Sequence, residues 1–123
     1  MREIQNIKQH SGEPFRRWFT GQGMDLIVWQ DDAHQPVGFQ LLFATRTNTV
    51  ALTWREHTGF SYHRVDDGEP RTRKRKPTPI LVGGSRFNKR AIRAHFKKLA
   101  ADIDPSVFLY VSEKLSLATT QIS

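Results

Sequence analysis

Short runs of aromatic, aliphatic and β-branched residues alternate with turn-forming clusters through the first half of the chain. The clusters are three to five residues long and rich in Gly, Asp, Thr and Gln. Loops of that length join antiparallel neighbours. The pattern predicts an antiparallel β-meander of four to five strands between about residues 15 and 66, the first being the least regular. The five runs are Phe15–Thr20, Met24–Gln30, Pro36–Ala44, Thr49–Glu56 and Phe60–Asp66.

The loop lengths also predict which residues face each other across the sheet. They pair Gln30 with Pro36, Ala44 with Thr49, and Glu56 with Phe60. A one-residue slip would move a strand's apolar set to the other face, so a continuous apolar row supports this register. We expect Trp54 in the core with Trp29 on the same face, whereas the pattern leaves Trp18 unplaced. The row consists of Ile27, Phe39, Trp54 and Tyr62.

After Gly84 the apolar spacing becomes helical. Ser85 is a favoured N-cap residue, and residues 86–101 are predicted to form a helix. Its apolar stripe has spacings of four, three and four and continues just past the predicted end: Ile92, Phe96, Leu99 and Ile103. Asp104 and Pro105 suit the N-cap and first position of a second helix over about 105–117. That helix offers Val107, Phe108, Val111, Leu115 and Ala118 to the core. Sheet first and helices last predicts an α+β domain with both helices packed on the aromatic sheet face.

The composition is compatible with one folded domain spanning residues 1–123. The 13 aromatic residues enlarge a core that a hydrophobic fraction of 37% would otherwise limit. The chain has no cysteine, which excludes disulfides and Cys-ligated zinc or iron–sulfur sites. No apolar run approaches the roughly 20 residues of a membrane-spanning helix, and the first residues lack a signal-peptide core. We therefore expect a cytoplasmic protein with no membrane partner.

The excess positive charge is confined to one stretch. Residues 71–98 contain eleven Arg and Lys with no Asp or Glu. Residues 1–70 carry seven basic against nine acidic residues, and residues 99–123 carry one against three. A near-neutral body with one concentrated basic region is typical of a protein with a polyanionic partner.

Five of those eleven cations fall in a segment without apolar residues. We expect residues 67–79 to form an exposed, mobile, proline-containing loop whose cations contact phosphates and release counterions. The same cations also resemble a nuclear-import signal, and an ordinary solubilising loop is the third interpretation. The cations are Arg71, Arg73, Lys74, Arg75 and Lys76.

The first predicted helix adds a cationic stripe beside its apolar one. Its members repeat at four, three and four: Arg86, Arg90, Arg93 and Lys97, with Lys89 and Lys98 nearby. Like charges at this spacing repel, and a bound anion would relieve that repulsion. A solvated helix face is the alternative, since Arg and Lys are good helix formers.

The second face of the meander carries polar residues that could bind a small anion or polarise a carbonyl. The predicted register places Gln40, Thr53 and His63 in one row, with Arg55 and Ser61 in the next row opposite Gly38. A solvated outer sheet face explains the same residues. No carboxylate is placed to orient His63, and no nucleophile is paired with a base.

These observations lead to a non-enzymatic binding protein without a cofactor or metal. The five histidines show no metal-ligand spacing, and no catalytic motif is present. We expect nucleic acid to dock through phosphate contacts, with an acidic protein surface as an alternative partner for the same cations. A small-molecule binder or enzyme working on the polar sheet face is the competing class. An unpaired outer strand, the first or the fifth, could also build a homodimer.

Overall fold

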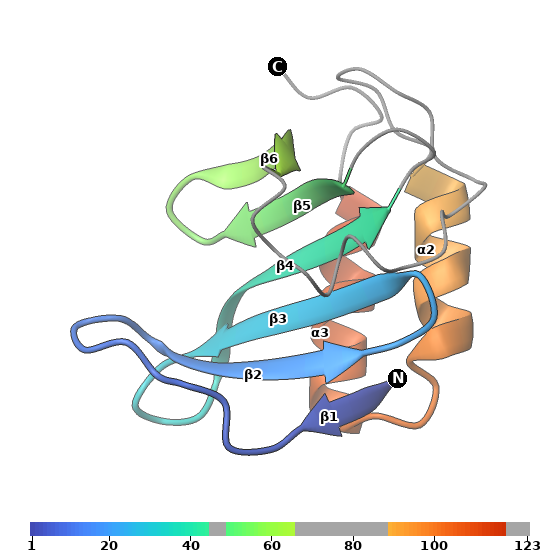
Figure 1. The fold of residues 1–123 in the computed structure, drawn as a ribbon. Helices are drawn as coiled ribbons and strands as arrows, with labels where there is room; N and C mark the ends of the chain where they lie inside the picture. Colours follow the sequence, from blue (N-terminus) through green and yellow to red (C-terminus); the bar gives the residue numbers. More distant parts are fainter. Residues whose placement is uncertain (45–48, 66–88, 118–123) are drawn as a thin grey trace.

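The computed structural model describes residues 1–44, 49–65 and 89–117, with the backbone alone for residues 44 and 63–65. Six strands form one antiparallel sheet, in the same order as along the chain (Figure 1). They are β1 (Arg2–Ile4), β2 (Phe15–Thr20), β3 (Met24–Gln30), β4 (Pro36–Ala44), β5 (Thr49–Arg55) and β6 (Gly59–Val65). The predicted meander is confirmed with one additional strand. The sequence did not predict β1 because three residues are too few to show an alternating pattern.

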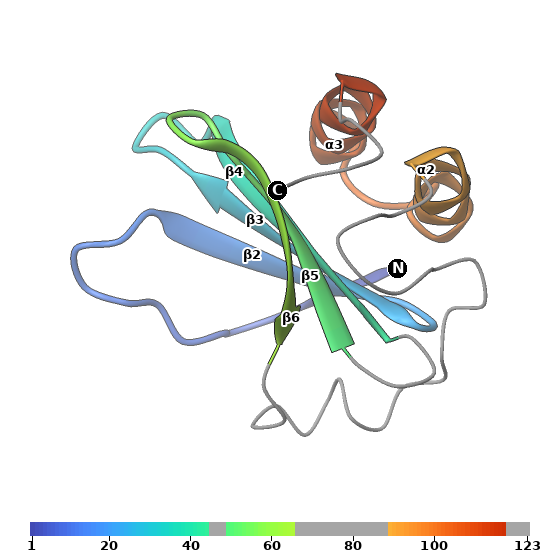
Figure 2. The same cartoon turned by 90° about the horizontal axis from the view of Figure 1, so that it is seen from above.

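Two helices follow the sheet, as the sequence predicts. Helix α2 (Lys89–Leu99) and helix α3 (Pro105–Leu117) lie side by side on one face of the sheet (Figure 2). The Asp104 carboxylate caps α3 by accepting from the Ser106 backbone N–H at 3.0 Å. Helix α2 ends two residues earlier than predicted. The α+β class, with helices on the aromatic face, is confirmed.

The main core lies between the sheet and the helices. Phe39 on β4 is fully buried and meets the Tyr110 ring of α3 edge-on at a centroid distance of 6.3 Å. Phe96 of α2 stacks on Phe108 of α3 at 5.8 Å, which joins the two helices. The helical stripes supply fully buried side chains as predicted: Ile92, Phe96, Val107, Val111 and Leu115.

The predicted pairing of β3 with β4 is correct at the hairpin end and wrong beyond it. Gln30 faces Pro36 as expected, but the register then shifts, so Trp29 faces Gly38 and Val28 faces Phe39. The irregularity is a β-bulge, which places one extra residue on one strand. Because a shift of one residue reverses the side-chain direction, Ile27 lies on the face away from the helices.

The pairing of β5 with β6 differs from the prediction by two positions. Arg55 pairs with Gly59, whose φ of 76° suits a turn, so Trp54 faces Phe60 and Leu52 faces Tyr62. A shift of two leaves each side chain on its predicted face. Trp54, Phe60 and Tyr62 therefore still pack against the main core.

The second face of the sheet carries its own small apolar cluster. Ile27, Leu42 and Ala51 are buried there, with Trp18 and Trp29 packed against them. The expectation that Trp29 shares the face of Trp54 is wrong, and the β3–β4 bulge is the cause. This face is also not the uniformly solvated surface that the sequence offered as an alternative.

The strand predicted as an outer edge, Phe15–Thr20, is internal because β1 pairs with it on the far side. In the described sheet, β1 and β6 are the two outer strands. The basic segment 67–79 and Arg86 lie outside the described residues.

Candidate functional site

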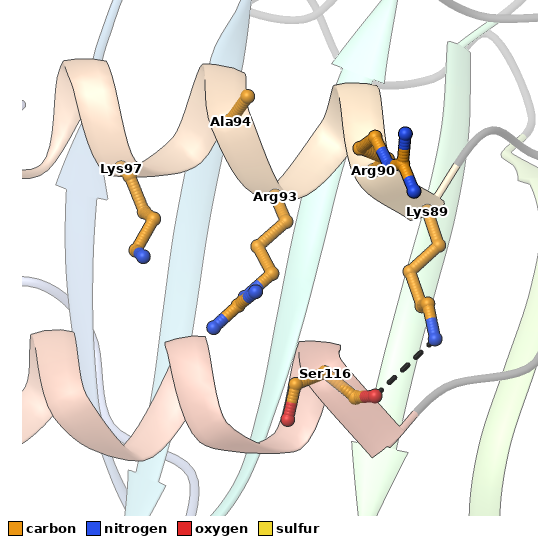
Figure 3. Close-up of a pocket in the computed structure, with 6 residues that line it drawn as sticks. All are labelled: Lys89, Arg90, Arg93, Ala94, Lys97 and Ser116. Atoms are coloured by element: carbon orange, nitrogen blue, oxygen red, sulfur yellow. Dashed lines mark hydrogen bonds between the residues drawn. The ribbon is translucent and has the colours of Figure 1, made fainter.

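Helix α2 gathers positive charge without a compensating acid. Over Lys89–Leu99 it carries five Lys and Arg residues and no Asp or Glu. Positions 89, 93 and 97 are four residues apart, so they lie along one side of the helix over two turns. Side chains from these positions extend toward α3 (Figure 3).

Between α2 and α3 the surface forms a groove of about 410 Å³. Of the six described residues that line it, four are cations and none is acidic: Lys89, Arg90, Arg93, Ala94, Lys97 and Ser116. Arg90, Ala94, Lys97 and Ser116 are exposed, whereas Lys89 and Arg93 are half-buried. The groove is therefore open to solvent at its rim, with the Arg93 side chain lying deeper. We refer to these six residues as the α2–α3 groove.

The groove cations differ in their partners from Arg17, a half-buried cation elsewhere in the fold. Arg17 on β2 pairs with Glu3 at 2.8 Å and with Asp104 at 3.1 Å. The Glu3 hydrogen bond is the main reason that the pKa of Arg17 lies well above its ordinary value. Among the described residues, no groove cation forms an ion pair.

Two of the groove cations have a local structural role. The Lys89 ammonium donates to the Ser116 backbone carbonyl at 3.2 Å, which satisfies an acceptor in the last turn of α3. Lys97 lies in the last turn of α2, where a cation interacts favourably with the helix dipole. These roles account for the positions of Lys89 and Lys97 but leave their remaining donors available.

Arg93 has no such local explanation. Its Nε lies buried and has no hydrogen-bond partner in the described part of the chain. A buried donor without an acceptor is costly, and native structures satisfy most such groups. Arg93 is therefore a cation held between two helices without a partner from the described chain.

The structure brings together only part of the predicted polyanion site. Arg90, Arg93 and Lys97 line the groove, whereas Arg71, Arg73, Lys74, Arg75, Lys76 and Arg86 lie outside the described residues. Sequence reasoning missed Ala94 and Ser116. The sequence did contain a signal for Ser116. The two helices are joined by a turn at residues 100–104 and run antiparallel, which places Lys89 opposite Ser116.

The polar sheet face is arranged differently from the prediction. Thr53 pairs with Gln40 as expected, but its other neighbour is Ser61, and His63 stands opposite Ala51. The predicted Gln40–Thr53–His63 row is therefore wrong, as is the neighbourhood of Arg55 and Ser61. The cause is the two-residue difference at the β5–β6 turn.

Within this face, three of the candidate ligand groups already interact with the sheet itself. The Gln40 amide donates to the Thr53 hydroxyl at 3.0 Å. The Arg55 guanidinium lies over the Trp29 ring, 4.0 Å from its centroid. Gly38 stands between them in the sheet, and its missing side chain leaves room for the ring. These contacts give Gln40, Thr53 and Arg55 a structural role.

The described residues offer neither a metal site nor a membrane-spanning helix. In residues 1–44, 49–65 and 89–117, no three His, Asp or Glu side chains are grouped to hold a metal ion. Neither described helix is long and apolar enough to cross a membrane. Comparison with protein-family models, with curated proteins and with solved structures finds no match for this chain.

Proposed function

We propose that the protein is a non-enzymatic binding protein that docks nucleic acid through phosphate contacts. The observation that carries the proposal is the α2–α3 groove, in which four cations meet without an acidic partner from the described chain. Charges of one sign concentrated in a groove focus the electrostatic field and attract the opposite charge.

The cations of α2 have no acidic residue on the same helix to balance their charge. Cations on a folded surface are commonly interspersed with acids, which lowers their mutual repulsion. Helix α2 has no acid at all, so its cations repel one another at their i, i+3 and i+4 spacings. Phosphates would relieve this repulsion and release counterions on binding. Contacts of this kind position a ligand without reading its sequence.

The test compares two variants with the same change in net charge. Arg90→Gln with Lys97→Gln removes two exposed groove cations, and Arg2→Gln with Lys8→Gln removes two exposed cations elsewhere. Binding to DNA and RNA oligonucleotides is measured across a salt series. We expect the slope of log K against log salt to fall by roughly two for the groove variant and by much less for the control.

Two results would overturn the proposal. One is negligible oligonucleotide binding at low salt. The other is an equal loss in both variants, which would mean that net charge alone attracts the ligand. Binding of polyglutamate without binding of oligonucleotides would favour an acidic protein partner instead. A further variant with Gln at Arg71, Arg73, Lys74, Arg75 and Lys76 tests the predicted basic loop in the same assay.

A further inference from the structure

We propose that the α2–α3 groove seats one discrete phosphate group, with Arg93 as its central ligand. This inference rests on the proposed function and makes it more specific. Diffuse electrostatic attraction depends only on the number of cations on α2. A specific phosphate site, which we call the seat, instead requires a particular side chain whose hydrogen-bond donors the described residues leave unused. Arg93 is the residue that distinguishes the two.

The Arg93 side chain is half-buried, and one of its donors is unused by the described residues. Its Nε is buried without a hydrogen-bond partner in the described part of the chain, and no described acid pairs with its guanidinium. The side chain extends from α2 toward α3, into the space that the groove residues surround (Figure 3). A guanidinium presents its donors in a planar fork that matches two oxygens of a phosphate. Because packing already restricts this side chain, it would lose little freedom on binding.

The neighbouring positions form a row of cations along α2 with Arg93 at its centre. Lys89 and Lys97 lie one turn before and one turn after it, about 6 Å away along the helix axis. Lys89 is fixed by its 3.2 Å hydrogen bond to the Ser116 carbonyl, so its charge stays at the groove. On α3, the Ser112 hydroxyl is also buried and has no hydrogen-bond partner within residues 1–44, 49–65 and 89–117, one turn before the groove residue Ser116. Both helices therefore carry a buried polar group, Arg93 Nε on α2 and Ser112 Oγ on α3, that the described residues leave without a hydrogen bond.

The ligand chemistry that fits is a phosphate group and not a carboxylate alone. A groove of about 410 Å³ has room for a tetrahedral oxyanion with part of its hydration shell, since one water occupies roughly 30 Å³ in the liquid. Three cations in a row along α2 suit a group whose negative charge is shared over several oxygens. In nucleic acid that group is either an internal diester or a terminal phosphate, which carries more charge.

The decisive comparison is between two substitutions that preserve charge. Arg93→Lys and Arg90→Lys both replace an arginine of α2 by a lysine, but Arg93 is half-buried and Arg90 is exposed. Binding of inorganic phosphate to the full chain is followed by NMR titration. We expect Arg93→Lys to weaken binding about tenfold, because a lysine lacks the planar fork, and Arg90→Lys to change it less than about twofold. In the wild type, the Arg93 Nε resonance should shift saturably with phosphate, a readout that needs no variant.

Three results would overturn the seat. They are equal binding by Arg93→Lys and wild type, equal losses in Arg93→Lys and Arg90→Lys, and an Arg93 Nε resonance that phosphate does not shift. In each case, salt-dependent oligonucleotide binding would leave the proposed function intact. Phosphate binding at Arg93 without oligonucleotide binding would instead reject the proposed function and retain the seat.

A comparison of oligonucleotides with a 5′-phosphate and with a 5′-hydroxyl identifies the source of the phosphate. Tighter, Arg93-dependent binding of the 5′-phosphorylated oligonucleotide indicates a terminal phosphate. Equal binding of the two indicates an internal diester.

Discussion

The Arg17 guanidinium on β2 donates to the Asp104 carboxylate at the start of α3 over 3.1 Å, joining residues 87 positions apart. The same guanidinium makes two hydrogen bonds to Glu3 of β1, at 2.8 and 2.9 Å. One side chain therefore ties the outermost strand, the sheet and the beginning of a helix together. Through this contact, the first described strand is linked to the start of the last described helix.

Removing the Arg17 side chain should lower the free energy of unfolding. Hydrogen bonds to charged groups contribute roughly 1.5–3 kcal/mol when buried, and partial exposure reduces this, so we expect a loss of about 1–2 kcal/mol for Arg17→Gln. Urea unfolding followed by circular dichroism measures it. Arg2→Gln, on an exposed residue of β1, should change stability by less than about 0.5 kcal/mol. Equal effects of the two substitutions would mean that the Arg17 contacts do not stabilise the fold.

The same contact makes stability depend on acid pH. Hydrogen bonds from Arg17 and then from Ser106 hold the pKa of Asp104 below its ordinary value of 3.8. The carboxylate therefore stabilises the folded state above pH 3.8, and this contribution is lost as pH falls through the lower folded pKa. Asp104→Asn should therefore make the free energy of unfolding depend less on pH in the acid range. We refer to this part of the pH dependence as the acid limb. Asp32→Asn, in an exposed turn, should leave that limb as in the wild type.

Gly38 should tolerate no side chain. A Cβ there would lie 2.8 Å from the Trp54 carbonyl oxygen and 3.1 Å from the Trp29 ring. We expect Gly38→Ala to destabilise the protein by about 1–3 kcal/mol, because backbone on a neighbouring strand cannot move aside. Thermal unfolding with tryptophan fluorescence measures both the loss and the displaced Trp29 ring. Trp29→Leu combined with Gly38→Ala should recover only part of the stability, since the backbone contact persists.

The stack between the two helices should be a sensitive part of the core. Phe96 is fully buried against Phe108, so Phe96→Ala should cost about 3–5 kcal/mol. A loss of that size is a large part of the stability of a small domain. Leu117→Ala on the end of α3, where the side chain is 65% exposed, is the matched truncation and should cost little. Chemical unfolding of both variants decides whether the helix pair is held by this stack.

Local patterns along the chain were sufficient for the two described helices and for every described strand except β1. The turn at Gly21–Gly23 and the strands on either side of it match the structure residue for residue, because glycine and strand-forming residues act through the local backbone. The Asp31 turn likewise forms where it was expected, with its carboxylate accepting from the Ala33 and Gln35 backbone N–H groups. Asp104 begins α3 as a cap for the same local reason.

The sequence alone also determined the charge of α2, since the absence of acids among its cations is a property of the chain. Only the tertiary structure decided which groups meet. The bulge in the β3–β4 pair moved Ile27 and Trp29 to the second face, because one extra residue on a strand reverses every following side chain. The groove exists because the Phe96–Phe108 stack sets α2 beside α3, which leaves the Arg93 Nε buried without a partner among the described residues. That contact depends on long-range packing, which no local pattern of residues records.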